Sequence, residues 1–107
     1  MALPPAAPPL PSSPAALQGV RVIEMGQLIA GPFCGKTLGE FGADVIKIEA
    51  PETGDPLRNW RLIKEGTSVW WQVQSRNKRS VALDLRQKEG QDIARQLIAE
   101  ADVLVEN

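Results

Sequence analysis

One stretch, residues 20–51, constrains the fold of this chain more than any other. Its first segment, VRVIEM, alternates and is rich in Val and Ile, which is typical of a strand, and a similar segment, DVIKIE, occupies residues 44–49. Between them lie a break containing glycine and proline (GQLIAGP) and a segment that favours a helix ending near Gly42 (FCGKTLGEFGA). A strand, a turn and a helix that lead directly into another strand indicate the start of a parallel α/β sheet.

The second half of the chain repeats this alternation. Residues 80–85 (SVALDL) alternate as a strand, residues 86–101 (RQKEGQDIARQLIAEA) have helical spacing, and residues 102–107 (DVLVEN) form a further strand. In both predicted helices the apolar residues recur at spacings that fit one buried face. These residues are Phe33, Leu38 and Phe41 in the first helix, and Ile93, Ala94, Leu97, Ile98 and Ala101 in the second. We therefore predict an α/β fold, a parallel sheet with flanking helices.

The segment between these halves has fewer regular features. Residues 50–68 contain two glycines and two prolines, which predicts an irregular loop, and loops of this length are often functional. Its free cations, Arg58 and Arg61, are either functional or solvated surface charges. At least one of the adjacent Trp70 and Trp71 is expected to pack on something outside this fragment, with core packing favoured and base stacking as the weaker alternative. A basic cluster follows, which could bind a phosphate or be an ordinary surface feature: Arg76, Lys78 and Arg79.

The composition excludes several classes of protein. The 107 residues fit one small domain, and a formal net charge of −1 gives no indication of a nucleic-acid or acidic partner. No apolar run is long enough to cross a membrane. Histidine is absent, so these residues contain no histidine-based metal site and no Ser-His or Cys-His pair. The one cysteine, Cys34, excludes an internal disulfide and fits a reducing compartment, so we expect a cytoplasmic protein.

The amino-terminal residues differ from the rest. Residues 1–17 are rich in Pro and Ala and contain no charged side chain, which predicts a disordered tail because proline blocks helix and sheet hydrogen bonding. This segment lacks the basic region of a signal peptide and the arginines of a mitochondrial transit peptide. We expect the folded domain to comprise residues 18–107.

The loop after the first predicted strand is the expected ligand site. In open parallel sheets, ligands bind beyond the carboxyl ends of the strands. Residues 27–32 lie there and open a helix, whose free N–H groups favour an anion such as a phosphate-bearing or acyl ligand. The loop matches neither G-x-G-x-x-G nor the phosphate-binding G-x-x-x-x-G-K-[ST], so a plain strand-to-helix turn is the alternative. Structural or solvated roles are expected for the acidic residues at strand edges: Asp44, Asp84 and Asp102.

Several short motifs occur in an order that resembles one family. They are A-G-P at 30–32, F-G-A-D-V-I-K-I-E at 41–49, G-D at 54–55, N-K-R-S at 77–80 followed by L-D-L at 83–85, and D-V-L-V-E-N at 102–107. In combination they resemble the family III CoA-transferases (the CaiB–BaiF type). Members include formyl-CoA and carnitine CoA-transferases, and α-methylacyl-CoA racemases are close relatives. The resemblance covers residues 17–107.

The resemblance implies that this chain is the N-terminal part of the family's large, Rossmann-like domain, which binds coenzyme A (CoA). CoA or acyl-CoA would then be a substrate, with no tightly bound cofactor. The family's CoA contacts carry over to three places: the backbone before G-P, the segment around the adenosine end, and the Asn that closes V-E-N. The corresponding residues are Ile29 and Ala30; Leu83, Asp84, Leu85 and Arg86; and Asn107. An arginine such as Arg86 suits a CoA phosphate.

Two features depart from the family pattern. Some members have a basic residue directly after K-I-E that reaches the nucleotide phosphates, whereas here Ala50 is followed by Pro51. The transferase mechanism also uses an aspartate that takes the acyl group as a mixed anhydride and then CoA as a thioester. In the family this aspartate lies beyond the last residue of this chain. We therefore assign no catalytic residue and expect the chain alone to be inactive.

The expected activity of the parent protein is transfer of CoA between an acyl-CoA and a carboxylic acid through an aspartyl-CoA thioester. The alternatives are an α-methylacyl-CoA racemase-type enzyme, which needs an acid–base pair to move the α-proton, and a non-catalytic CoA-binding fragment. The resemblance implies an interlocked homodimer for the full-length protein. Because the chain stops on a predicted strand, we expect a fragment that is marginally stable and prone to associate.

Overall fold

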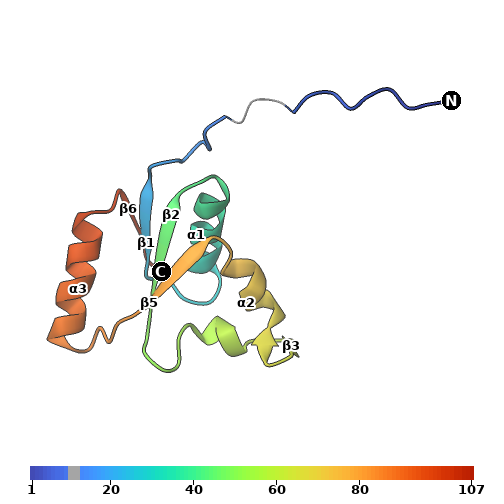
Figure 1. The fold of residues 1–107 in the computed structure, drawn as a ribbon. Helices are drawn as coiled ribbons and strands as arrows, with labels where there is room; N and C mark the ends of the chain where they lie inside the picture. Colours follow the sequence, from blue (N-terminus) through green and yellow to red (C-terminus); the bar gives the residue numbers. More distant parts are fainter. Residues whose placement is uncertain (10–12) are drawn as a thin grey trace.

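The computed structural model describes residues 1–9 and 13–107. Its centre is a sheet of four strands in which every neighbouring pair is parallel (Figure 1). In spatial order these are β5 (Lys78–Ala82), β2 (Asp44–Glu49), β1 (Arg21–Glu24) and β6 (Val103–Val105). Counted along the chain within this sheet, the order is 3-2-1-4, that of the first four strands of a Rossmann sheet. The predicted α/β fold with a Rossmann-like parallel sheet is confirmed.

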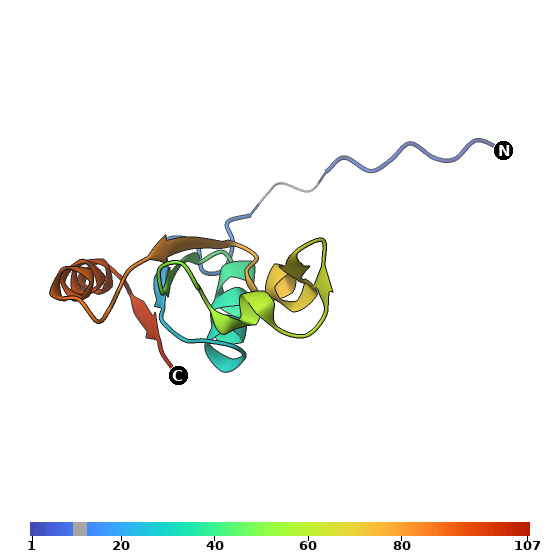
Figure 2. The ribbon, with the colours of Figure 1, turned by 90° about the horizontal axis from the view of Figure 1, so that it is seen from below.

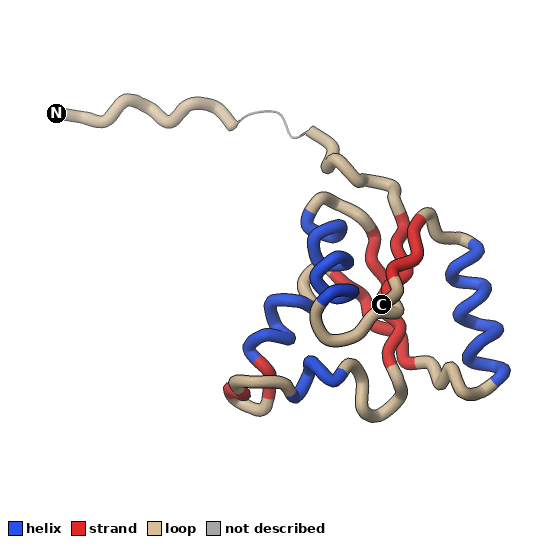
Figure 3. The backbone as a smooth tube through the Cα atoms, turned by 180° about the vertical axis from the view of Figure 1, so that it is seen from behind, coloured by secondary structure: helices blue, strands red, loops and turns tan. Residues whose placement is uncertain are grey.

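Helices cover both faces of this sheet. One face is covered by α3 (Lys88–Ala99), and the other by α1 (Ala30–Glu40) with the short helix α2 (Val69–Gln74) beside it (Figures 1 and 2). Figure 3 shows the same layers from behind, with the sheet between α3 and the other helices. Within residues 1–9 and 13–107, no helix combines the length and the apolar character needed to span a bilayer.

The segment predicted as an irregular loop contains short regular elements. They are the 3-10 helix η1 (Pro56–Asn59) and an antiparallel pair, β3 (Ile63–Lys64) and β4 (Thr67–Ser68). Beyond them, Trp70 on α2 stacks on Trp60, with ring centroids 5.2 Å apart. Trp60 and Trp70 therefore pack together within this chain, whereas the Arg58 guanidinium lies over the Trp71 ring.

The face of the sheet under α3 is an ordinary apolar core. Ile23, Ile46 and Ile48 pack there with Ala94, and the predicted residues Leu97, Ile98 and Ala101 pack against them. The prediction was wrong for Ile93, which is 44% exposed. Since successive helical residues are about 100° apart, Ile93 falls at the flank of a face centred on the other four.

On the opposite face of the sheet, the buried side chains change from apolar to charged along the strands. Near the amino ends it is apolar, where Val22 and Val45 pack together. Two residues further along each strand the side chains are charged and still buried: Glu24 is 0% exposed and Lys47 is 1% exposed. Burial on both faces is expected of a central parallel strand, but buried charges require partners and room.

Helix α1 provides that room by turning small residues to the sheet. Its buried positions are Gly31, Pro32, Gly35 and Gly39, whereas Phe33 and Phe41 are 53% and 57% exposed. The predicted buried face was therefore wrong for both phenylalanines. Of the three residues predicted for it, Leu38 is the one that packs against the cluster of Val22 and Val45. The cause is steric, because a Cβ at Gly35 would overlap the carboxylate of Glu24.

The amino-terminal region has no helix or strand within residues 1–9 and 13–15, and residues 1–9 extend away from the sheet (Figure 1). Part of the predicted disordered tail, residues 10–12, lies outside the described residues. The Leu17 N–H donates to the carbonyl of Phe41, the C-cap residue of α1, at 2.8 Å, which joins this region to the folded part of the chain. The division into a tail of residues 1–17 and a domain of residues 18–107 stays a prediction.

Replacing Gly35 by Ala should destabilise the fold, although alanine is the better helix former by about 1 kcal/mol. The new methyl group would displace the buried Glu24 carboxylate, which the Lys78 ammonium holds at 2.6 Å. We expect the free energy of unfolding to fall by roughly 2–4 kcal/mol, measured by urea unfolding with circular dichroism.

The control is Cys34→Ala, one residue earlier on the exposed side of α1. It should change stability by less than about 0.5 kcal/mol. If Gly35→Ala were as stable as the wild type, close packing of α1 on Glu24 would be refuted.

Candidate functional site

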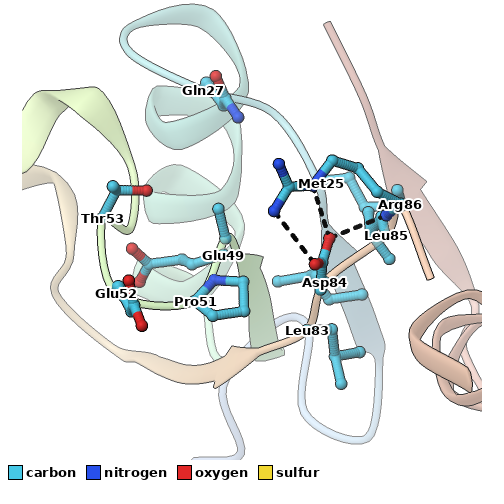
Figure 4. A pocket seen from close by; sticks show the side chains of 12 residues that line it. Met25, Gln27, Glu49, Pro51, Glu52, Thr53, Leu83, Asp84, Leu85 and Arg86 are labelled. Carbon is cyan, nitrogen blue, oxygen red and sulfur yellow. Dashed lines mark hydrogen bonds and ion pairs between the residues drawn. The ribbon is translucent and has the colours of Figure 1, made fainter.

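An open cavity of about 490 Å³ lies at the carboxyl ends of β1, β2 and β5. This is the sheet edge at which ligands bind in open α/β folds. Figure 4 shows residues from the segment after β2 along one side and residues from the segment after β5 along the other. The lining residues are Met25, Gln27, Ile48, Glu49, Ala50, Pro51, Glu52, Thr53, Leu83, Asp84, Leu85 and Arg86.

Four of the seven predicted site residues line this cavity together: Leu83, Asp84, Leu85 and Arg86. They were predicted at the end of a strand, but β5 ends at Ala82 and they form the turn that follows it. The last sheet hydrogen bond runs from the Leu83 N–H to the Glu49 carbonyl at 2.9 Å. Leu83 and Leu85 also pack against the apolar core on the α3 face, so this segment connects the core to the cavity lining.

Arg86 is held in place by Asp84 (Figure 4). Asp84 Oδ1 accepts from the Arg86 backbone N–H and from Nε, both at 3.0 Å, and Oδ2 accepts from Nη2 at 3.1 Å. These hydrogen bonds hold the pKa of the Asp84 carboxyl below its usual value. The Arg86 side chain is nevertheless 87% exposed, so its guanidinium is oriented by Asp84 and open to an anionic ligand.

The other three predicted residues lie beside the cavity rather than in its lining. Asn107 bonds to the backbone of Gln27 in both directions: its Oδ1 accepts from the N–H at 2.9 Å, and its Nδ2 donates to the carbonyl at 3.3 Å. Ile29 and Ala30 stand where α1 begins, and Ile29 is 44% exposed. The structure thus places Asn107 against the loop that contains Gln27, at the strand-order reversal between β1 and β6.

Sequence reasoning missed the buried charges behind the cavity. The Lys47 ammonium donates to Glu24 Oε2 at 2.6 Å and to the Gly26 carbonyl oxygen at 2.8 Å, and it forms an ion pair with Asp55 Oδ2 at 2.8 Å. The available signal was the placement of Lys47 and Glu49 on one face of a strand otherwise made of Val and Ile. In a central parallel strand that face is buried, which indicates paired charges.

Each cation of the predicted basic cluster pairs with a carboxylate. Lys78 is buried and its ammonium bonds to Glu24 Oε1 at 2.6 Å and to the Pro32 carbonyl at 2.7 Å. Burial lowers the pKa of this lysine. The two arginines of the cluster pair with carboxylates of other elements, Arg76 with Glu40 and Arg79 with Asp44. All three cations of the cluster thus have partners within the chain, one of them in a buried pair.

Arg58 is likewise committed to a structural partner and is not a free cation. Its Nε and Nη2 donate to the two Glu49 oxygens at 2.7 and 2.8 Å, and its guanidinium lies 4.0 Å from the Trp71 ring centre. Burial raises the pKa of Glu49, but hydrogen bonds from Arg58, Ser80 and the Asp55 backbone outweigh it and lower the pKa from 4.5 to about 2. Glu49 thus stays ionised at the base of the cavity.

The strand order and the cavity at the carboxyl edge define a Rossmann-type ligand-binding domain. Residues 17–107 match the sequence profile of CoA-transferase family III. This chain belongs to that family.

Individual relatives agree with this assignment. The chain is 48% identical over 95 residues to a succinyl-CoA–D-citramalate CoA-transferase of Chloroflexus aurantiacus, covering 88% of this chain and 24% of the relative. It is 42% identical over 92 residues to a formyl-CoA:oxalate CoA-transferase of Escherichia coli, covering 85% and 22%. A CAIB/BAIF family protein from Brucella suis superposes with a TM-score of 0.80 at 42% identity, over 89% of this chain and 26% of that one. The chain thus spans about a quarter of the length of these relatives.

The low pKa of Glu49 predicts a specific pH dependence of stability. Because its folded-state pKa is depressed from 4.5 to about 2, the ionised carboxylate contributes stability that is complete above about pH 5 and is lost as the pH falls toward 2. The contribution is roughly 3 kcal/mol. Urea unfolding at a series of pH values between about 6 and 3 should show this decline.

The Glu49→Gln variant should be less stable near neutral pH and should lose much less stability on acidification. Glu52→Gln, which changes an exposed carboxylate on the same loop, should decline like the wild type. If the pH profile of Glu49→Gln were parallel to that of the wild type, Glu49 would not be the titrating group.

Proposed function

We propose that this chain is the CoA-binding part of a family III CoA-transferase. The observation that carries the proposal is the cavity at the carboxyl edge of the sheet, whose lining includes the segment 83–86 and an exposed, oriented arginine. Relatives over 40% identical are named as CoA-transferases acting on succinyl-CoA or formyl-CoA, which supports CoA as the shared ligand. CoA binds here as a substrate rather than as a resident cofactor.

In this proposal three segments contact CoA. Leu83, Asp84, Leu85 and Arg86 surround the adenosine end, and the Arg86 guanidinium donates to a phosphate. The backbone of Ile29 and Ala30 meets the ligand at the start of α1, and Asn107 contributes from the end of β6. Ala50 and Pro51 line the cavity where some relatives have a basic residue, so Arg86 has a larger share of phosphate binding here.

The proposed reaction of the full-length protein moves CoA from an acyl-CoA to a carboxylic acid. An aspartate carboxylate attacks the thioester carbonyl and expels the CoA thiolate, giving a mixed anhydride. The thiolate then attacks the aspartyl carbonyl and releases the first acid, leaving an aspartyl-CoA thioester. The acceptor acid attacks the carbonyl of that thioester and expels the CoA thiolate, which gives a second mixed anhydride. The thiolate then attacks the acceptor's acyl carbonyl in this anhydride, forming the new acyl-CoA and releasing the aspartate carboxylate.

No aspartate of this chain is assigned that role. Each of its five aspartates has a structural partner, which supports a nucleophile elsewhere in the parent protein. Asp55 is buried against Lys47, Asp84 orients Arg86, and Asp102 accepts from the Arg21 backbone at 2.8 Å. The remaining two, Asp44 and Asp92, pair with arginines. The transferase names of the relatives favour this reaction over α-methylacyl-CoA racemisation.

We also propose that the full-length protein acts in the cytoplasm as an interlocked homodimer. The exposed thiol of Cys34 suits a reducing compartment. A multimer is in keeping with two relatives of Chloroflexus aurantiacus named as alpha and beta subunits of a succinyl-CoA–L-malate CoA-transferase.

The test is calorimetric titration of the 107-residue chain with CoA and acetyl-CoA. We expect saturable binding, and Arg86→Ala should raise the Kd about tenfold, the factor for losing one charge-assisted hydrogen bond to a phosphate. The matched control is Arg76→Ala. Arg76 is also exposed and paired with a carboxylate, but it lies before β5, at the opposite edge of the sheet.

Arg76→Ala should bind CoA like the wild type. Equal affinities for the wild type and Arg86→Ala would remove Arg86 from the site. A folded chain that takes up no CoA would overturn the proposal that this part of the family fold binds the ligand by itself.

A further inference from the structure

We infer that Asp55 is a positioning residue for the CoA site, because its buried carboxylate joins the two loops that form adjoining walls of the cavity. One loop links β1 to α1 and contains Gln27; the other links β2 to η1 and contains residues 51–53. The inference rests on the proposed function. It adds a residue that does not touch the ligand and sets the shape of the site.

The contacts of Asp55 reach both loops. Its Oδ1 accepts from the Leu28 N–H at 3.0 Å, in the first loop, and from the Leu57 N–H at 2.9 Å, in η1. Its own N–H donates to Glu49 Oε2 at 2.8 Å, which closes the second loop back onto the end of β2. One side chain thus fixes the spacing between two segments that are far apart in sequence.

The first loop needs this support because Leu28 has a φ of +63°, a conformation that L-residues with a Cβ rarely adopt. The bond from Asp55 holds its N–H in that orientation. On the other side of Gln27, the Gly26 carbonyl accepts from the Lys47 ammonium, which also pairs with Asp55 Oδ2 at 2.8 Å. Asp55 therefore acts on both neighbours of Gln27, directly at Leu28 and through Lys47 at Gly26.

Burial decides how Asp55 acts. Asp55 is 2% exposed and Lys47 is 1% exposed, so neither reaches a ligand in the cavity. Both residues act through Gln27 and residues 51–53, which line the cavity. If the loop shifts by a fraction of an ångström, the backbone at the start of α1 moves away from the position that CoA requires.

The competing explanation is purely local, since Asp55 is also the N-cap residue of η1. Two substitutions separate the roles. Asp55→Ser keeps a capping oxygen for Leu57 but is too short to reach Leu28 or Lys47. Asp55→Asn keeps an acceptor for both N–H groups and gives up the ion pair with Lys47.

The experiment measures both the loop and the ligand, in the full chain labelled with ¹⁵N and at a temperature where each variant is folded. Hydrogen exchange and the HN–Hα coupling of Leu28 report whether its amide is bonded and its φ positive. Calorimetry reports the Kd for CoA. The control for a general loss of stability is Val45→Ala, which creates a cavity in the apolar core near the amino ends of β1 and β2.

We expect Asp55→Ser to abolish the protection of the Leu28 amide and to raise the CoA Kd about tenfold or more. Asp55→Asn should keep the protection and have an affinity between those of Asp55→Ser and the wild type, because it keeps the contact to Leu28 and loses the ion pair with Lys47. Val45→Ala should bind like the wild type. If Asp55→Ser does not fold, Asp55→Glu replaces it. This variant keeps the charge opposite Lys47 and moves the oxygens by one methylene, so the same loss of protection and affinity is expected.

Three results would overturn the inference, and they differ from failure of the proposed function. The first is loss of hydrogen-exchange protection at the Leu28 amide in Asp55→Ser or Asp55→Glu with no change in the Kd for CoA. The second is an unprotected Leu28 amide in the wild type, and the third is an affinity loss in Val45→Ala equal to that in Asp55→Ser. A wild type with a protected Leu28 that binds no CoA would instead refute the proposed function, and the positioning role with it.

Discussion

The buried ammonium of Lys47 is the interaction on which the rest of the structure depends. It bonds to Glu24 on β1, to Asp55 beyond β2 and to the Gly26 carbonyl, so one charge ties together a strand and two loops. Burying these ions costs several kcal/mol of hydration each, and breaking one pair costs roughly 3–5 kcal/mol. Such a network therefore adds little net stability but strongly disfavours any arrangement of the loops in which a charge is left unpaired.

The network also explains the unusual packing of α1. A helix that covers carboxylates and ammonium groups has to approach closely enough to exclude water, and glycines allow this. Gly35 lies directly over Glu24, and the Pro32 carbonyl accepts from Lys78. The phenylalanines of α1 consequently face outward, and the polar half of the sheet lies directly behind the ligand edge.

The same charge pairing determines which cations are available to a ligand. Arg58, Arg76, Lys78 and Arg79 each pair with a carboxylate on another element. Arg86 differs because its partner, Asp84, is two residues away and leaves it exposed at the cavity. An exposed arginine oriented by a local carboxylate fits phosphate recognition better than a dense cluster whose charges are already neutralised.

The sequence alone determined the four strands of the parallel sheet, the helices α1 and α3, and the family, because alternation, helical spacing and short motifs report local geometry and one-sided burial. It also identified Leu83, Asp84, Leu85 and Arg86, which the structure brings together at the cavity. The tertiary structure decided the face of α1, the fate of the basic cluster and the place of Asp55 beside Leu28. Each of these depends on which strands become neighbours and on which buried charges are then brought into contact. A contact such as that between Asp55 and Leu28, 27 residues apart, produces no periodic pattern in the sequence from which it could be predicted.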